Sequence, residues 1–109
     1  MKSIFATFII ATALTVAAIS LSAADAAAGK DVYLKKCASC HGQAGEGKDA
    51  IAKTLKVEFK HLGSKEIQAK NDADLKKTIL EGTGKMKAVK DVDAKQADDV
   101  VAFVRTLKK

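Results

Sequence analysis

The sequence contains no proline, no tryptophan and only two cysteines, and aromatic side chains account for 5% of its 109 residues. Because Cys37 and Cys40 are the only cysteines, the chain has no second CxxC pair with which to complete a zinc ribbon or zinc finger. It has no run of alternating apolar residues long enough for a sheet, and so lacks the βαβ setting of a thioredoxin-like dithiol. After residue 24 only Tyr33, Phe59 and Phe103 are aromatic, which predicts a domain that packs around something other than its own side chains.

The first 24 residues have the composition of a secretory signal peptide. Lys2 is their only charged residue, and an apolar stretch runs from residue 4 to residue 21. Residues 22–24 and 24–26 both satisfy the small-x-small rule for cleavage, so we expect the mature chain to begin at Asp25 or Ala27. We predict a cleaved signal peptide over residues 1–24 and a periplasmic or otherwise exported protein without stable membrane insertion. An uncleaved anchor is the alternative, because the stretch is just long enough to span a bilayer.

Residues 37–41 read Cys-Ala-Ser-Cys-His, the spacing of covalent c-type haem attachment. On one helical turn, thiols three positions apart face the same way and can both reach the vinyl groups of a porphyrin, and the next residue can turn its imidazole towards the iron. We predict that Cys37 and Cys40 form thioethers to one haem c and that His41 is the proximal iron ligand. A structural disulfide is one alternative, and zinc held by both cysteines, His41 and His61 is another.

Residues 25–109 show helical signals without a linker or repeat, which predicts a single all-α domain of three or four helices. We expect a first helix from about residue 27 to 37, a short helix over 50–55 and an irregular crossing over 57–62 that buries Phe59. A third helix has an N-cap signal at Asn71 and a stop signal at Gly82. The last helix begins with a capping box at Asp93 and Gln96 and has an apolar stripe, formed by Ala97, Val100, Val101, Val104 and Leu107.

Two residues are candidates for the sixth iron ligand. Met86 is the only methionine after the signal segment, and it lies in a loop rich in glycine and lysine with no apolar stripe to join. We predict that Met86 is the distal ligand. His61 is the alternative, and a second imidazole would give a low-potential centre.

With these motifs the chain resembles the small monohaem class I cytochromes c of bacteria over residues 27–109. The family has a glycine, an aromatic residue and the first haem cysteine at four-residue steps, then a glycine-rich loop after Cys-His-Gly, a distal methionine and an aromatic residue in the last helix. The matching positions are Gly29, Tyr33 and Cys37, then residues 40–47, then Met86, then Phe103. The resemblance implies the cytochrome c fold, in which the N- and C-terminal helices cross and long loops enclose the haem.

The absence of proline is a departure from this family, whose members commonly carry one about a dozen residues after the haem histidine. Its carbonyl accepts the hydrogen bond of the imidazole ring N–H, which orients the ligand. We expect a backbone carbonyl between residues 50 and 55 to take this role for His41.

The predicted function is one-electron transfer, without enzymatic activity, by a monomer that meets redox partner proteins. Alternatives are a haem protein with an open sixth position, acting as a ligand sensor or peroxidase, and a carrier with two histidine ligands. The mature chain would carry 18 basic and 13 acidic residues, a balance that favours partners with acidic docking surfaces. Lysines that flank the two haem motifs are candidates for this contact, namely Lys35, Lys36, Lys48, Lys85, Lys87 and Lys90. Nucleic-acid binding is not expected, because no recognition motif is present.

Overall fold

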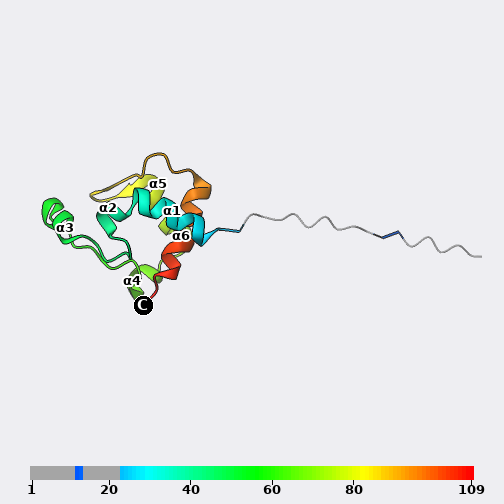
Figure 1. The fold of residues 1–109 in the computed structure, drawn as a ribbon, viewed down its shortest axis with the longest axis horizontal. Coiled ribbons are helices and arrows are strands. Elements are labelled where there is room, and N and C mark those ends of the chain that lie inside the picture. The colour runs from blue at the N-terminus through cyan, green and yellow to red at the C-terminus, as the bar shows by residue number, and fades with distance from the viewer. Residues whose placement is uncertain (1–11, 14–22) are drawn as a thin grey trace, which may run out of the picture.

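The computed structural model describes residues 12–13 and 23–109, and the predicted signal peptide lies largely outside these residues. The elements follow in the order α1 (Ala26–Lys36), α2 (Ala38–His41), α3 (Asp49–Leu55), α4 (Lys65–Gln68), α5 (Asp72–Glu81), β1 (Gly82–Thr83), β2 (Met86–Lys87) and α6 (Ala94–Thr106) (Figure 1). Within this described part, no helix has the length and apolar character needed to cross a membrane. The all-α prediction is confirmed in its main feature, since the only strands described are two residues long.

Helices α1 and α6 cross at the centre of the core (Figure 1). Gly29 makes the crossing possible, because a Cβ there would lie 1.8 Å from the backbone oxygen of Asp99. One turn further along α1, the Tyr33 ring lies 5.0 Å from that of Phe103, and Tyr33 is only 1% exposed. The predicted crossing of the terminal helices is therefore confirmed, and the glycine and the aromatic pair hold it.

The predicted helix starts are confirmed by their cap hydrogen bonds. The Asn71 side chain accepts from the Asp74 amide at 2.8 Å, and Asp93 and Gln96 form the full capping box of α6. The N-cap of α1 was not predicted. It is Asp25, whose side chain accepts a hydrogen bond from the Ala27 amide at 2.9 Å. Each cap satisfies amide groups that have no partner within the helix.

Two details of the fold differ from the sequence-based expectation. The first helix ends at Lys36, and the haem motif continues in the separate single turn α2, so the described helices outnumber the three or four expected. The loop expected after Gly82 contains a minimal hairpin, in which Thr83 pairs with Met86. Its two-residue connection begins at Gly84, whose φ of 53° suits the first position of a tight hairpin turn.

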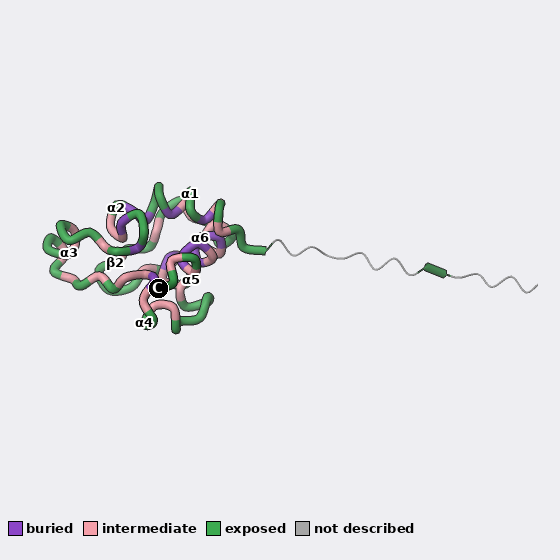
Figure 2. The backbone as a smooth tube through the Cα atoms, turned by 60° about the horizontal axis from the view of Figure 1, so that its bottom comes forward, coloured by how far each residue is buried: buried purple, intermediate pink, exposed green. Residues whose placement is uncertain are grey.

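The connection between α2 and α5 has few buried side chains. Neither α3 nor α4 contains a buried residue, whereas Figure 2 shows burial concentrated along α1, α2 and α6. The expected burial of Phe59 is wrong in extent, since this residue is only partly buried. Backbone hydrogen bonds hold this connection, including one from the Leu62 amide to the Gly45 carbonyl at 2.9 Å.

Candidate haem-binding site

The haem motif forms one short helical turn. The His41 amide donates to the Cys37 carbonyl at 2.9 Å, and the Gly42 amide donates to the Ala38 carbonyl at 2.9 Å. Gly42 then ends the turn with a φ of 78°, a conformation that glycine adopts without strain. The two cysteines are thus three positions apart on a turn, as the motif requires.

Three hydrogen bonds fix the end of this turn to the rest of the fold. The Tyr33 hydroxyl donates to the Gly42 carbonyl at 2.6 Å, and the amides of Gly47 and Lys48 donate to the carbonyls of His41 and Cys40 at 2.6 and 2.9 Å. Burial raises the pKa of Tyr33 to about 12, with a further contribution from the nearby Cys37 and Glu46, so its hydroxyl is a lasting donor at neutral pH. The haem motif is therefore joined directly to the α1/α6 crossing.

Both cysteines are free thiols, and they differ in burial. Cys37 is buried, whereas Cys40 is partly exposed. Burial, reinforced by the proximity of Cys40, raises the pKa of Cys37 to about 11. The Cys37 thiol is thus protonated at neutral pH, and neither sulfur is engaged in a disulfide.

His41 has an uncharged and partly unpartnered imidazole. Burial lowers its pKa, which keeps the ring neutral at physiological pH. Among the described residues its Nδ1 is the one buried side-chain nitrogen or oxygen without a hydrogen-bond partner. Phe59 packs edge-on against the ring at 5.4 Å. A neutral imidazole next to two free thiols fits a covalently attached haem, because metal ligation requires the unprotonated ring.

The expectation that a carbonyl of residues 50–55 orients His41 is wrong in this structure, because Nδ1 has no partner. The carbonyls at the two ends of this range are otherwise engaged. The Ala50 carbonyl accepts from the Thr54 hydroxyl at 2.9 Å, and the Leu55 carbonyl accepts from the Lys85 ammonium at 2.5 Å. Packing of Phe59 is the contact that the structure does provide to the ring.

Met86 lies in strand β2 and is partly buried. In Figures 1 and 2 its hairpin lies at the same end of the molecule as α2 and α3. The Lys85 bond to the Leu55 carbonyl ties this hairpin to the end of α3, across 30 residues of sequence. No sequence pattern indicated that bond, which restrains the residue next to Met86.

His61 has a different environment from His41. The Gly63 amide donates to His61 Nδ1 at 2.8 Å, so in the neutral ring the proton is on Nε2. Within residues 23–109 no three or more His, Cys, Asp or Glu side chains are grouped to hold a metal ion, as the zinc alternative would require. Sequence analysis also missed Glu46, whose carboxylate accepts from the Ala44 amide at 2.9 Å and shapes the loop after the motif.

Comparison with known proteins identifies the family. The family model described as cytochrome c oxidase, cbb3-type, subunit III matches residues 24–104. The chain belongs to this family of c-type cytochrome domains. A solved structure titled KustC0563 c-type cytochrome aligns with a TM-score of 0.63 and 28% identity, covering 74% of this chain and 98% of that one. No curated protein matches the sequence.

The family membership confirms the resemblance to small class I cytochromes c and the all-α cytochrome c fold. Proteins of this type are electron-carrying haem proteins, and their haem c is covalently bound. Their electron transfer uses redox partner proteins. In this cytochrome, the thiols and the neutral imidazole of residues 37–41 are the groups that fit such a cofactor.

Proposed function

We propose that this cytochrome is a one-electron carrier with a single haem c, attached through Cys37 and Cys40 and ligated by His41 and Met86. The observation that carries the proposal is the buried, neutral imidazole of His41 directly after two free thiols. When bound, the haem supplies a ferric/ferrous couple, and a thioether ligand favours the ferrous state relative to a second imidazole. No substrate is transformed, so the protein is not an enzyme by itself.

The residues around the motif would keep both ligands in place during oxidation and reduction. Tyr33 holds the Gly42 carbonyl, and so fixes the turn that carries His41. Lys85 and the Thr83–Met86 pairing restrain the hairpin that carries the sixth ligand. Ligands that stay in position lower the rearrangement that accompanies each electron transfer.

Met86 is preferred to His61 as the sixth ligand. The Nδ1 of His61 already accepts a hydrogen bond, which places the proton of its neutral ring on Nε2, the nitrogen that would have to bind iron. The Met86 sulfur needs no hydrogen-bond partner, because a thioether is only a weak acceptor. Its place beside the restrained Lys85 also supports this role.

We further propose that residues 1–24 are removed on export, that the protein works as a periplasmic monomer, and that its partners have acidic docking surfaces. The mature charge of 18 basic and 13 acidic residues becomes about +4 with ferric haem and about +3 with ferrous haem, when two propionates are counted. All six lysines proposed for docking are exposed, namely Lys35, Lys36, Lys48, Lys85, Lys87 and Lys90. A positive surface speeds encounter with an acidic partner.

Absorption spectroscopy of the exported protein tests the ligand assignment. The reduced α-band reports covalent haem, and the weak far-red ferric band reports the bond from methionine sulfur to iron. Met86→Ala should abolish the far-red band and open the iron to cyanide or carbon monoxide, whereas the control His61→Ala should leave the spectrum unchanged.

Each other outcome selects a different function. A changed haem spectrum in His61→Ala, together with an unchanged spectrum in Met86→Ala, would assign two histidine ligands and a low-potential carrier. Binding of carbon monoxide by the unmodified protein would indicate an open sixth position and a sensor or peroxidase. Absence of a haem spectrum from folded, exported protein would refute the proposal.

A further inference from the structure

Asp99 is a charged side chain placed unusually for its type, because it is buried at 6% exposure among the described residues. It lies on α6 at the crossing with α1, where its backbone oxygen faces Gly29. Its carboxylate Oδ1 accepts two hydrogen bonds, from the Asp25 backbone nitrogen at 2.8 Å and from Lys95 Nζ at 2.5 Å. The bond from Asp25, together with Lys95, lowers the pKa of Asp99, so the carboxylate is ionised at neutral pH.

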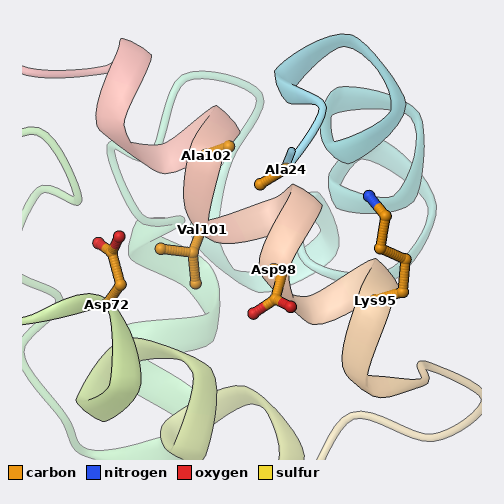
Figure 3. A pocket seen from close by; sticks show the side chains of 6 residues that line it. All are labelled: Ala24, Asp72, Lys95, Asp98, Val101 and Ala102. Carbon is orange, nitrogen blue, oxygen red and sulfur yellow. The ribbon is translucent and has the colours of Figure 1, made fainter. Parts of the chain in front are cut away.

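Asp25 is the residue at which the folded domain begins. Its side chain caps α1 by accepting from the amides of Ala27 and Ala28 at 2.9 and 3.2 Å, and its carbonyl accepts from Gly29 at 2.9 Å. The residue before it, Ala24, lies against α6 beside the side chains of Lys95, Asp98, Val101 and Ala102 (Figure 3). The peptide bond between Ala24 and Asp25 therefore lies directly beside the Asp99 carboxylate.

We propose that export processing hydrolyses the bond between Ala24 and Asp25, and that the new amino terminus of Asp25 forms an ion pair with Asp99. The proposal rests on the export of the cytochrome proposed above. Water adds across the peptide bond, so the carboxylate leaves on Ala24 and the amine stays on Asp25, where it takes up a proton. The neutral N–H that now donates to Asp99 would become an ammonium donor at the same atom, and charge-assisted hydrogen bonds of this kind are the stronger ones.

The charges around the Asp25 nitrogen favour the ammonium form of the new N-terminus. The carboxylates closest to it are those of Asp25 itself and of its acceptor Asp99, and Asp98 and Asp72 line the hollow beside Ala24. Asp98 is paired with Lys76 at 3.0 Å and Asp72 with Arg105 at 2.7 Å, which leaves the carboxylates of Asp25 and Asp99 against the single charge of Lys95. The partial positive charge of the α1 N-terminus opposes the new charge, but it is smaller than one unit. The α-amino group ordinarily has a pKa of about 7.7–8.0, and this surplus of carboxylates should raise it.

Cleavage at the other small-x-small position, after Ala26, would have different consequences. It would remove Asp25, and with it the α1 cap, the carbonyl partner of Gly29 and one of the two donors to Asp99. The amides of Ala27 and Ala28 would lose their acceptor at the start of the helix. The tertiary structure thus distinguishes two sites that the sequence rule treats alike.

The first experiment is the intact mass of the exported holoprotein, with tandem mass spectrometry of its N-terminal peptide. We expect a chain that begins at Asp25. A chain beginning at Ala27, or one that retains residues 1–24, would overturn the proposal. The haem contribution to the same mass, and the haem spectrum, report separately on the proposed electron-carrier function.

The second experiment measures how fast an amine-reactive anhydride labels the N-terminal amine at pH 7, read from the mass of the N-terminal peptide. Only the neutral amine reacts, so pairing with Asp99, which raises the pKa of the amine, should slow labelling by about three- to tenfold relative to an unpaired amine. Asp99→Asn should restore fast labelling, whereas the neighbouring control Asp98→Asn should have a smaller effect. Lys95→Gln should slow labelling further, because the ammonium would then be the remaining partner of Asp99.

The opposite effects of Asp99→Asn and Lys95→Gln separate an ion pair from simple loosening of the helix start. Loosening would speed labelling in both variants. Equal labelling rates in the unmodified protein, Asp99→Asn and Lys95→Gln would overturn the ion pair, even if cleavage occurs before Asp25.

Discussion

The α1/α6 crossing and the connection from α2 to α5 are stabilised in different ways. The crossing is held by interlocked side chains, with Tyr33 and Val100 exposed by 1% and 2%. The connection contains α3 and α4, which have no buried residue, and it is held by hydrogen bonds of its backbone and of the Gln68 and Arg105 side chains. We infer that the crossing can pack by itself, whereas the connection needs the haem to pack against. The predictions below test this difference.

The largest effect should come from the haem attachment itself. In the double variant Cys37→Ser, Cys40→Ser we expect the yield of holoprotein to fall at least about tenfold, because a chain this small depends on the cofactor for its core. Hydrogen exchange on any remaining chain should show loss of protection over residues 42–70 before α1 and α6. Haem staining and hydrogen exchange are the measurements.

The matched control is Ser39→Ala, which changes one of the two residues between the cysteines and should keep the haem. Normal yield of a haem-free, cooperatively folded double variant would contradict both the haem assignment and the proposed difference between the two regions.

The crossing should be most sensitive at its glycine. Gly29→Ala places a Cβ at 1.8 Å from the backbone oxygen of Asp99, so α1 and α6 must separate. We expect a loss of about 3 kcal/mol or more in the free energy of unfolding, measured by denaturant titration of the holoprotein.

Gly84→Ala is the comparison for this prediction. Gly84 has a positive φ of 53° but nothing within 4 Å of a Cβ, so only backbone strain of about 1–2 kcal/mol is expected. If Gly84→Ala proved as costly as Gly29→Ala, close approach of the helices would not explain the glycine in α1.

A smaller effect is expected at the hydrogen bond that joins the two regions. Tyr33→Phe removes the donor to the Gly42 carbonyl, at a cost of about 1–3 kcal/mol in the free energy of unfolding. Thr78→Val is the control, because the hydrogen bond from its hydroxyl to the Asp74 carbonyl is exposed to solvent, and its loss should change stability by about 0.5 kcal/mol at most.

Comparison of the unmodified protein with Tyr33→Phe also gives a test of pH dependence. The pKa of Tyr33 is raised from 10.0 to about 12 in the folded state, so the folded protein holds this proton more tightly than the unfolded chain. Its contribution to stability is present below pH 10 and declines as the pH rises towards 12. Unfolding titrations across this range should therefore show a decline that Tyr33→Phe lacks. If the free energies of unfolding of the unmodified protein and Tyr33→Phe changed with pH in the same way, burial would not raise the pKa of the Tyr33 hydroxyl.

The smallest effect should be on rates of encounter with an acidic partner. The substitutions Lys85→Glu and Lys87→Glu should slow association more than Lys108→Glu and Lys109→Glu, if the side near Met86 is the docking face. The difference should shrink with added salt, because screening acts over about 8–10 Å at physiological ionic strength. Stopped-flow kinetics at several salt concentrations measure both effects.

The two possible failures of this prediction have different meanings. Equal effects from both pairs of substitutions would mean that net charge guides the encounter. Rates that do not depend on salt would mean that the partner meets the protein through apolar contacts.

Short-range patterns account for what could be predicted. The spacing of Cys37, Cys40 and His41 indicated the haem motif, and capping residues such as Asn71 and Asp93 marked helix starts to within a residue. Gly29 and Tyr33, at four-residue steps, indicated a face that packs closely against another helix. These signals are local, because helix periodicity and caps depend on residues a few positions apart.

The sequence by itself determined the family, the helical class and the candidate haem residues. Only the tertiary structure decided that Nδ1 of His41 lacks an acceptor, that Lys85 bonds to the Leu55 carbonyl, and that Asp25 meets a buried Asp99. The last contact joins residues 74 positions apart. No periodicity or local motif records such a contact, because it depends on where two helices meet in space and on which polar groups that meeting buries.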